Sequence, residues 1–276
     1  MTRGHAMSPA GSLAKRRALV TGGCGGIGYG IAMALAGQGA ALIIHDLDDH
    51  GRRSEVEAGL RGAGAERVDF AFFDLASSEV SRRELSRIRE SGHVDILVNN
   101  AGVQSTEPLA SMSRATWDMI LAVNLSAAFD TMRCFLPSMA ERSYGRVVNI
   151  ASVHGLVASV HKAAYVAAKH GLLGLTKVAA LEYASAGSAV TGGVTVNAIC
   201  PGWTETPLIE PQIERFTREH GGRRDEGVGA LLAEKQPSLR FTHPTDIGAL
   251  VCFLASDAAH NITGTSIAMD GGWTAL

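Results

Sequence analysis

Seven short runs of β-forming residues alternate with longer helical patterns over nearly the whole chain. The runs cover residues 18–20, 41–44, 68–72, 96–98, 147–150, 194–199 and 265–269. Several are apolar at every position, as expected of strands that are covered on both faces. Between them, apolar residues recur at helical spacing, for example at Ile27, Ile31 and Leu35. Because strands that alternate with helices form parallel sheets, we predict an α/β fold: a doubly wound parallel sheet of about seven strands with helices on both faces.

The same patterns predict a single domain that covers residues 15–276. Residues 1–14 are polar and rich in Gly, Ser and Pro, and they lack the apolar segment of a signal peptide, so we expect a disordered tail. The alternation breaks over residues 204–244, which carry many charges, several glycines and two plausible short helices. A connection this long at a strand end is more often a binding segment than a plain connector, so we expect a substrate lid there.

Charge and cysteine content exclude several classes of protein. The 25 Lys and Arg residues nearly balance the 27 Asp and Glu residues, and the net charge of −2 provides no field that attracts nucleic acid. The four cysteines are scattered, and the histidines show no metal-ligand spacing, which argues against a metal site and a disulfide framework. No apolar run reaches the ~18 residues of a spanning helix. We therefore expect a cytoplasmic protein that binds no metal, membrane or nucleic acid.

Glycines gather between the first predicted strand and the first predicted helix, in Thr21-Gly22-Gly23-Cys24-Gly25-Gly26-Ile27-Gly28. Such a turn lets the backbone approach a pyrophosphate, whose charge is met by free N–H groups at the helix N-terminus. Asp46 ends the second strand about 20 residues later, the spacing of a carboxylate that binds an adenosine ribose. Either feature alone could be an ordinary turn. Together they favour a Rossmann-type dinucleotide site.

Further polar or turn-forming residues follow other predicted strands, namely Asp74, Asn99-Asn100-Ala101-Gly102, Ser152 and Pro201-Gly202. Each could be a cap or a turn. Because the carboxyl ends of parallel strands meet at one edge of the sheet, where ligands bind, we expect them to surround one site. Tyr165 and Lys169 lie four residues apart on a predicted helix, so both side chains share one face. We expect Lys169, with an oxidised nicotinamide, to lower the tyrosine pKa from about 10.

The combination of the Thr21–Gly28 turn, Asn99–Gly102, Asn124, Ser152, Tyr165-x-x-x-Lys169 and Pro201-Gly202 resembles the short-chain dehydrogenase/reductase family over about residues 15–276. The resemblance implies that Tyr165 is the acid/base and that Ser152 orients and polarises the carbonyl. It implies that Lys169 holds the ribose and lowers the tyrosine pKa, and that Asn124 anchors a proton-relay water. The implied dinucleotide site comprises Thr21, Gly22, Gly26, Ile27, Gly28, Asp46, Asp74, Leu75, Asn100, Ala101, Gly102, Tyr165, Lys169, Pro201, Gly202, Thr204 and Thr206.

The expected cofactor is NAD. The charge of Asp46 would repel the 2′-phosphate of NADP. Arg52 and Arg53 come later, on the expected following helix, where they are poorly placed to capture that phosphate.

Several further segments resemble the bacterial D-3-hydroxybutyrate dehydrogenases, a group within this family. They begin at Ala101, Ser152, Lys162, Ile199, Glu234 and Asp270. This resemblance implies an NAD-dependent interconversion of (R)-3-hydroxybutyrate and acetoacetate, with the substrate carboxylate held by Gln104, His154, Lys162 and Gln212. The implied substrate site as a whole comprises Gln104, Ser152, His154, Lys162, Tyr165, Trp203 and Gln212.

Some segments depart from that group. Residues 185–193 form a longer link into the sixth strand, and Thr204-Glu205 and His161 replace more usual residues near the substrate. The reaction could therefore involve another small hydroxy acid, a sugar alcohol or a 3-oxoacyl thioester. A non-catalytic dinucleotide-sensing scaffold is the other alternative, but it would predict losses among Asn124, Ser152, Tyr165 and Lys169. Residues 162–184 are apolar around most of their helix, which predicts a homo-oligomer, and the resemblance implies a homotetramer.

Overall fold

The computed structural model describes residues 13–188 and 190–275 and contains one parallel sheet of seven strands. The strands are β1 (Arg17–Thr21), β2 (Ala41–Asp46), β3 (Val68–Phe72), β4 (Ile96–Asn99), β5 (Tyr144–Ile150), β6 (Gly193–Pro201) and β7 (Ser266–Met269). Their order across the sheet is β3-β2-β1-β4-β5-β6-β7. The predicted doubly wound parallel sheet is therefore confirmed.

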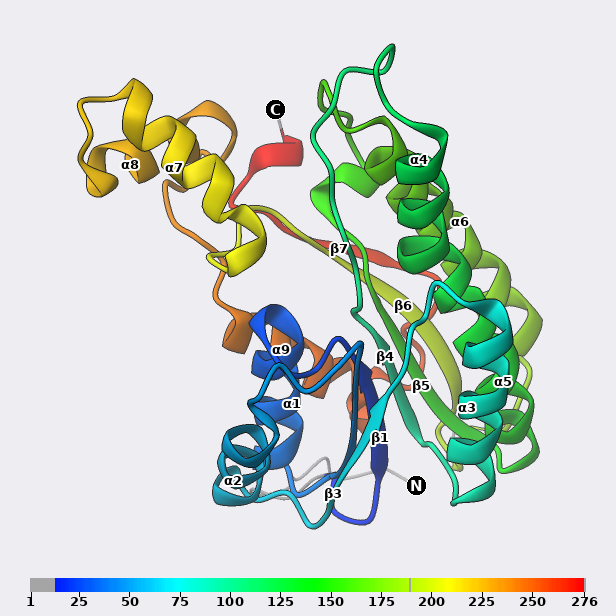
Figure 1. Cartoon of the computed structure of the whole chain (residues 1–276). Helices are drawn as coiled ribbons and strands as arrows, with labels where there is room; N and C mark the ends of the chain where they lie inside the picture. The colour runs from blue at the N-terminus through cyan, green and yellow to red at the C-terminus, as the bar shows by residue number, and fades with distance from the viewer. Residues whose placement is uncertain (1–12, 189, 276) are drawn as a thin grey trace.

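Helices cover both faces of the sheet (Figure 1). One layer consists of α1 (Gly26–Gly37), α2 (Arg53–Ala63) and α9 (Pro244–Ala255). The other consists of α3 (Ser78–Glu90), α4 (Arg114–Leu121), α5 (Ala127–Glu141) and α6 (Ala163–Tyr183). Between each layer and the sheet lies a buried apolar cluster, centred on residues such as Ile31 and Val251 on one face and Leu85 and Phe135 on the other.

The helix starts follow from their capping residues. The side chains of Ser77 and Ser113 accept hydrogen bonds from backbone N–H groups in the first turns of α3 and α4. Helix α9 begins at Pro244, a residue preorganised for the first helical position, and the Asp246 carboxylate accepts a hydrogen bond from the backbone N–H of His243. Local sequence thus determines where these helices begin.

The chain is already folded at Leu13. That side chain is 2% exposed, and its backbone N–H donates to the Gln38 carbonyl. The expected disordered tail of residues 1–14 therefore extends at least two residues too far, because Leu13 completes the apolar cluster beside α1. Residues 1–12 lie outside the described residues.

One stretch of the described residues is long and apolar enough to cross a membrane by length and composition alone. It is the continuous helical segment 114–141, which contains an 18-residue window with a mean hydropathy of 1.4. Its α5 part packs against α3, α6 and the sheet, and its buried residues include Met132 and Phe135. This packing is that of a core helix.

Residues 204–244, which we call the lid, contain the two expected short helices, α7 (Glu210–Glu219) and α8 (Arg224–Lys235). Both helices project from the carboxyl end of the sheet (Figure 1). They pack on each other around Ile213, Phe216 and Leu231. The two ends of the lid meet, because Thr204 bridges to Thr242. Helices α7 and α8 thus pack on each other, while Ser238 and Thr242 hydrogen-bond to the chain at and after β7.

Candidate active site

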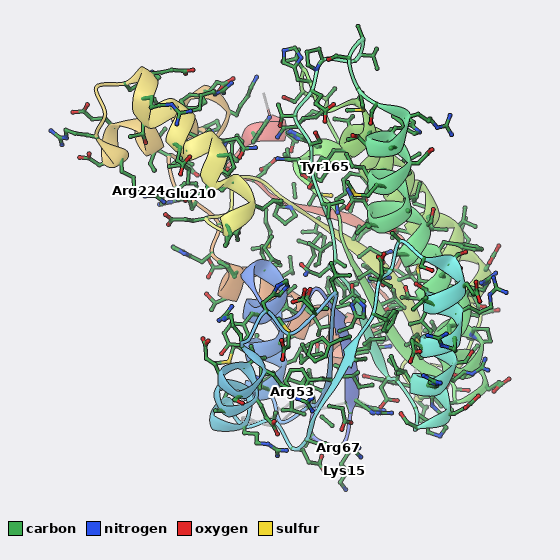
Figure 2. The ribbon with its side chains drawn as sticks, in the orientation of Figure 1. Lys15, Arg53, Arg67, Tyr165, Glu210 and Arg224 are labelled. Carbon is green, nitrogen blue, oxygen red and sulfur yellow. The ribbon has the colours of Figure 1, made fainter. Side chains whose placement is uncertain are left out.

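A cavity of about 530 Å³ lies at the carboxyl edge of the sheet, where β1 and β4 are neighbours. This is the topological switch point, at which doubly wound sheets bind ligands. Tyr165 lies at this end of the molecule with Glu210 and Arg224 of the lid, whereas Lys15 and Arg67 lie at the opposite end (Figure 2). The predicted cofactor residues that line the cavity are Gly22, Gly26, Ile27, Asp46, Asp74, Leu75, Asn100, Ala101, Gly102, Tyr165, Lys169 and Thr206.

The glycine-rich turn fits the pyrophosphate of a dinucleotide. Gly22 and Gly26 have φ angles of 63° and 51°, a conformation that favours glycine. A Cβ atom on Gly22 would lie 3.0 Å from the Cα atom of Ala101, so the turn and the β4 loop approach closely. Helix α1 begins after Gly25 with no side-chain cap and no acidic residue in its first turn. Its N-terminal N–H groups can therefore bind an anion.

Thr21 and Gly28, two predicted cofactor residues, do not line the cavity but position the residues that do. The hydroxyl of Thr21 accepts hydrogen bonds from the backbone N–H groups of Asn100 and Ala101, both at 3.0 Å. A Cβ atom on Gly28 would lie only 2.0 Å from the Gly22 carbonyl oxygen, so glycine is required for α1 to pack on the turn. The other predicted cofactor residues line a neighbouring chamber: Pro201, Gly202 and Thr204.

Asp46 lies at the end of β2, as expected, and lines the cavity. Its two carboxylate oxygens accept hydrogen bonds from the backbone N–H groups of Cys24 and Leu47. Arg53 begins α2, but Arg52 precedes the helix and also lines the cavity. The Arg52 guanidinium donates to the Cys24 carbonyl at 3.0 Å and to both Glu55 oxygens. Among the described residues, this cavity is therefore lined by the carboxylates of Asp46 and Asp74 and by the Arg52 guanidinium, three of whose five N–H donors are engaged.

Tyr165, Ser152 and Lys169 come together as the sequence predicts. Tyr165 and Lys169 share one face of α6, and the Lys169 Nζ atom is 5.6 Å from the tyrosine ring centroid. Nζ donates to the Ile150 carbonyl at 2.8 Å. Ser152 follows β5; its hydroxyl accepts a hydrogen bond from the His154 backbone N–H at 3.1 Å and lies close enough to Tyr165 to lower the pKa of the phenol. The arrangement places an acid/base, a polar orienting group and a cation beside the cavity.

Asn124 lies in a π-helical turn, Ala122–Ser126, between α4 and α5. Its side chain pairs with the backbone of Val103 through both Oδ1, at 2.8 Å, and Nδ2, at 2.7 Å. With Lys169 it lines a cavity of about 10 Å³, close to the lower limit for one water molecule. This position fits the expected relay of protons through a water.

Burial dominates the electrostatics of these residues. It raises the pKa of Tyr165, which the Ser152 hydrogen bond offsets only in part. The residues of the chain alone therefore do not produce the expected lowering of the Tyr165 pKa. Burial also lowers the pKa of Lys169 to about 8. The pKa of His154 falls to about 3, through burial first and then the charge of Lys162, so this imidazole is neutral at physiological pH.

Beside Tyr165 lies a small chamber of about 70 Å³, which we call the reaction chamber. Lys162 is 7% exposed there, and its Nζ atom is 5.5 Å from the Trp203 ring centroid. Within the described part of the chain, no carboxylate oxygen lies within 4.0 Å of that ammonium group. The predicted substrate residues that line the reaction chamber are Gln104, Ser152, His154, Lys162, Tyr165 and Trp203.

Gln212 is not among them. It lies on α7 and lines a second cavity of about 430 Å³, which we call the outer chamber. Four side chains line both chambers: His154, Lys162, Trp203 and Trp273. The four residues expected to hold one carboxylate therefore do not share one chamber, because the lid places Gln212 beyond Lys162 and His154.

Trp273 is a site residue that the sequence prediction omitted. It follows β7, so applying the carboxyl-edge rule to the last strand would have found it. The two departures noted in the sequence have different places in the structure. His161 lines the outer chamber, and Thr204 lines the reaction chamber, but Glu205 pairs with Arg224 of α8 at 3.1 Å and lies in the lid. Among residues 13–188 and 190–275, no cluster of three His, Cys, Asp or Glu residues could hold a metal ion.

Comparisons with known proteins agree with this geometry. A family model described as enoyl-(acyl carrier protein) reductase matches residues 22–274. A D-beta-hydroxybutyrate dehydrogenase of Cupriavidus necator is 45% identical over 94% of this chain and 98% of its own length. One of Rhizobium meliloti is 41% identical over 94% and 99%.

A solved structure from Beutenbergia cavernae is also similar, with a TM-score of 0.84 and 34% identity over 97% of this chain and 100% of that one. It is named provisionally as an NAD(P) dependent gluconate 5-dehydrogenase and contains NADP at low occupancy. The parallel sheet, the glycine turn, the Tyr165/Lys169 pair and these relatives lead to one conclusion: the chain belongs to the short-chain dehydrogenase/reductase family.

Proposed function

We propose that this oxidoreductase interconverts (R)-3-hydroxybutyrate and acetoacetate with NAD as its cofactor, as a cytoplasmic homotetramer. The observation that carries the proposal is Lys162. A buried ammonium group without an anionic partner is unfavourable unless a ligand supplies the anion. It lines the same small chamber as Tyr165, so a short acid could place its carboxylate at Lys162 and its hydroxyl at the phenol. The names of the two 3-hydroxybutyrate dehydrogenases that resemble this chain support the same substrate.

The proposed chemistry assigns one task to each side chain. Ser152 hydrogen-bonds the hydroxyl of the substrate, and the Tyr165 phenolate takes the hydroxyl proton. NAD in the cofactor cavity would supply the acceptor for the hydride that leaves C3. Lys169 stabilises the phenolate by its charge, and the small cavity beside Asn124 and Lys169 provides a route by which the proton leaves. In the reverse direction Tyr165 returns the proton to the ketone oxygen.

The carboxylate is held by Lys162 and by hydrogen bonds from the neutral His154 and from Gln104. Gln212 faces the same residues from the lid, across the outer chamber. Closure of the lid over a bound acid would bring Gln212 to the carboxylate and exclude water. In this proposal, closure of the lid depends on the substrate carboxylate, because Gln212 binds that group only in the closed position.

NAD is proposed over NADP because Asp46 would accept hydrogen bonds from the ribose hydroxyls and repel a 2′-phosphate. Arg52 is the one cation that lines that end of the cavity among the described residues. Three of its five N–H donors are engaged by Glu55 and by the Cys24 carbonyl. A phosphate would compete with these partners for the guanidinium.

The test is a comparison of (R)-3-hydroxybutyrate with 2-butanol, with either NAD or NADP. Lys162→Ala should lower kcat/KM for the acid by at least about tenfold, because a charge-assisted hydrogen bond contributes ~1.5–3 kcal/mol. The loss for the neutral alcohol should be smaller. Lys177→Ala, which removes an exposed lysine of α6, is the matched control. Equal losses on both substrates would contradict the clamp, and equal efficiency with NADP would contradict the cofactor.

The same assay has a predicted pH dependence. Burial lowers the pKa of Lys162 to about 8, so its charge is present below that pH and lost above it. The ratio of kcat/KM for the acid to that for the alcohol should therefore fall as the pH rises through about 8. Lys169 acts on both substrates, so its titration cancels in the ratio. In Lys162→Ala the ratio should be independent of pH in this range.

A further inference from the structure

The outer chamber is larger than a short acid requires. The reaction chamber of about 70 Å³ is far below the roughly 300–1,000 Å³ of typical ligand sites, whereas the outer chamber of about 430 Å³ lies within that range. It is bounded by residues 159–162 on one side and by α7 and α8 of the lid on the other. His154, Lys162, Trp203 and Trp273 line both spaces, so the two chambers adjoin at the position proposed for the carboxylate.

Three residues that line the outer chamber each carry a buried polar atom without a partner. These atoms are Nδ1 of His154, Nε1 of Trp203 and Oε1 of Gln212, none of which has a hydrogen-bond partner among the described residues. His154 is itself 4% exposed. Buried polar groups are normally satisfied, and leaving one unsatisfied costs free energy. His154 and Trp203 lie where the two chambers adjoin and Gln212 lies on α7, so a polar ligand between them could supply the missing partners after small side-chain movements.

Positive charge predominates in the lining. Lys162, Arg215 and Lys235 contribute three cations, and Glu234 is the one carboxylate among the lining residues. Arg215 and Lys235 have ion-pair partners only at 3.9 Å, Glu219 and Glu234 respectively. Pairs this long and exposed contribute little, so both cations can turn to another anion.

We propose that the outer chamber is a second anionic subsite, which binds the carboxylate of hydroxy acids longer than 3-hydroxybutyrate. Such an acid keeps its methyl carbinol at Tyr165, passes between His154 and Trp203, and places its carboxylate near Arg215 and Lys235. The substrate class is thus (ω−1)-hydroxy acids with several methylene groups between the carbinol carbon and the carboxylate. The inference rests on the proposed function only in that Tyr165 and Ser152 act on the carbinol.

The experiment uses three compounds with the same reacting end: (R)-3-hydroxybutyrate, (R)-5-hydroxyhexanoate and the methyl ester of the latter. Steady-state kcat/KM is measured with the full chain and the double variant Arg215→Gln/Lys235→Gln. The ratio of kcat/KM for 5-hydroxyhexanoate to that for 3-hydroxybutyrate should fall by about tenfold, mainly through KM, since a charge pair across a binding site is lost. The neutral ester should show no such loss.

The control is Arg218→Gln, which removes an exposed arginine of α7 that does not line the chamber. Its ratio should stay within about twofold of the wild type, as for a solvent-exposed charge. An unchanged ratio in the double variant, or an equal loss with the ester, overturns the subsite and leaves the proposed function standing. Turnover of 5-hydroxyhexanoate that depends on both cations, with no turnover of 3-hydroxybutyrate, supports the subsite and rejects the proposed function.

Discussion

Tyr165 lies where a phenol is difficult to ionise. Burial raises its pKa, and the nearest cation, Lys169, donates to the Ile150 carbonyl and lies 5.6 Å from the ring centroid. The chain alone therefore keeps the phenol protonated at neutral pH. A positively charged nicotinamide in the cavity would shift the equilibrium toward the phenolate, so we expect the base to form only in the complex with oxidised cofactor.

Tyr165→Phe should lower kcat by at least about 100-fold, because it removes the group that transfers the proton. NADH affinity should stay within about twofold, since the change deletes one hydroxyl and leaves the rest of the cavity intact. Steady-state turnover and NADH fluorescence titration measure the two quantities. Tyr183→Phe, at the far end of the same helix, is the control. Near-wild-type turnover in Tyr165→Phe would exclude the assignment.

At the scale of single residues, the sequence could predict where a residue lies along its helix or strand. The spacing of Tyr165 and Lys169 places both on one face of any helix, whatever surrounds it. The direction of the tyrosine pKa could not be predicted, because burial depends on elements distant in sequence. The place of Gln212 could not be predicted either, because it depends on how the lid stands relative to the sheet.

At the scale of elements, apolar runs predicted all seven strands. The observed bounds differ from the predicted ones where a strand contains polar or small residues. Strand β5 begins at Tyr144, three residues before the predicted run, because Gly145 and Arg146 interrupt the apolar pattern. Arg146 is nonetheless fully buried and donates to the carbonyls of Gly145 and Gly193. The π-helical turn that carries Asn124 has no comparable signal in the sequence.

The contact between α1 and the glycine turn gives a prediction at this scale. Gly28→Ala would place a Cβ atom 2.0 Å from the Gly22 carbonyl oxygen and 2.6 Å from Asn100 Nδ2, so the helix or the turn must move. We expect NADH affinity to fall by at least about tenfold and the melting temperature to decrease, as for other overpacked sites. Fluorescence titration and thermal unfolding measure both.

Gly37→Ala, in the last turn of the same helix, is the matched control. A Cβ atom there would meet only the Ala63 carbonyl oxygen, at 3.9 Å, which is an ordinary contact. It should leave NADH affinity unchanged and stability equal or slightly higher, since alanine is the better helix former. If Gly28→Ala binds NADH as well as Gly37→Ala does, the turn is not positioned by this contact.

At the scale of the whole molecule, the outer face of α6 exposes large apolar side chains among its polar ones in the single chain. Val178 and Leu181 are 51% and 79% exposed, and Phe129 of the neighbouring α5 is 46% exposed. Such a patch predicts an interface between copies. The tetramer expected from the sequence should appear in light scattering at micromolar concentration, and Leu181→Glu should dissociate it into smaller species.

Val190→Glu, in the surface loop before β6, is the control, because that side chain is 83% exposed and lies outside α6. It should keep the mass of the wild type. A monomeric wild-type chain would contradict the prediction, and so would a Leu181→Glu variant with an unchanged mass.

The lid has a kinetic consequence, because both of its ends meet at the bridge between Thr204 and Thr242. Thr206 lines the cofactor cavity and the reaction chamber, while Gln212 lines the outer chamber. Residues of this one segment therefore form part of the walls of all three spaces. We therefore expect the departure of product and that of the dinucleotide to be coupled, because residues of one segment line both binding spaces.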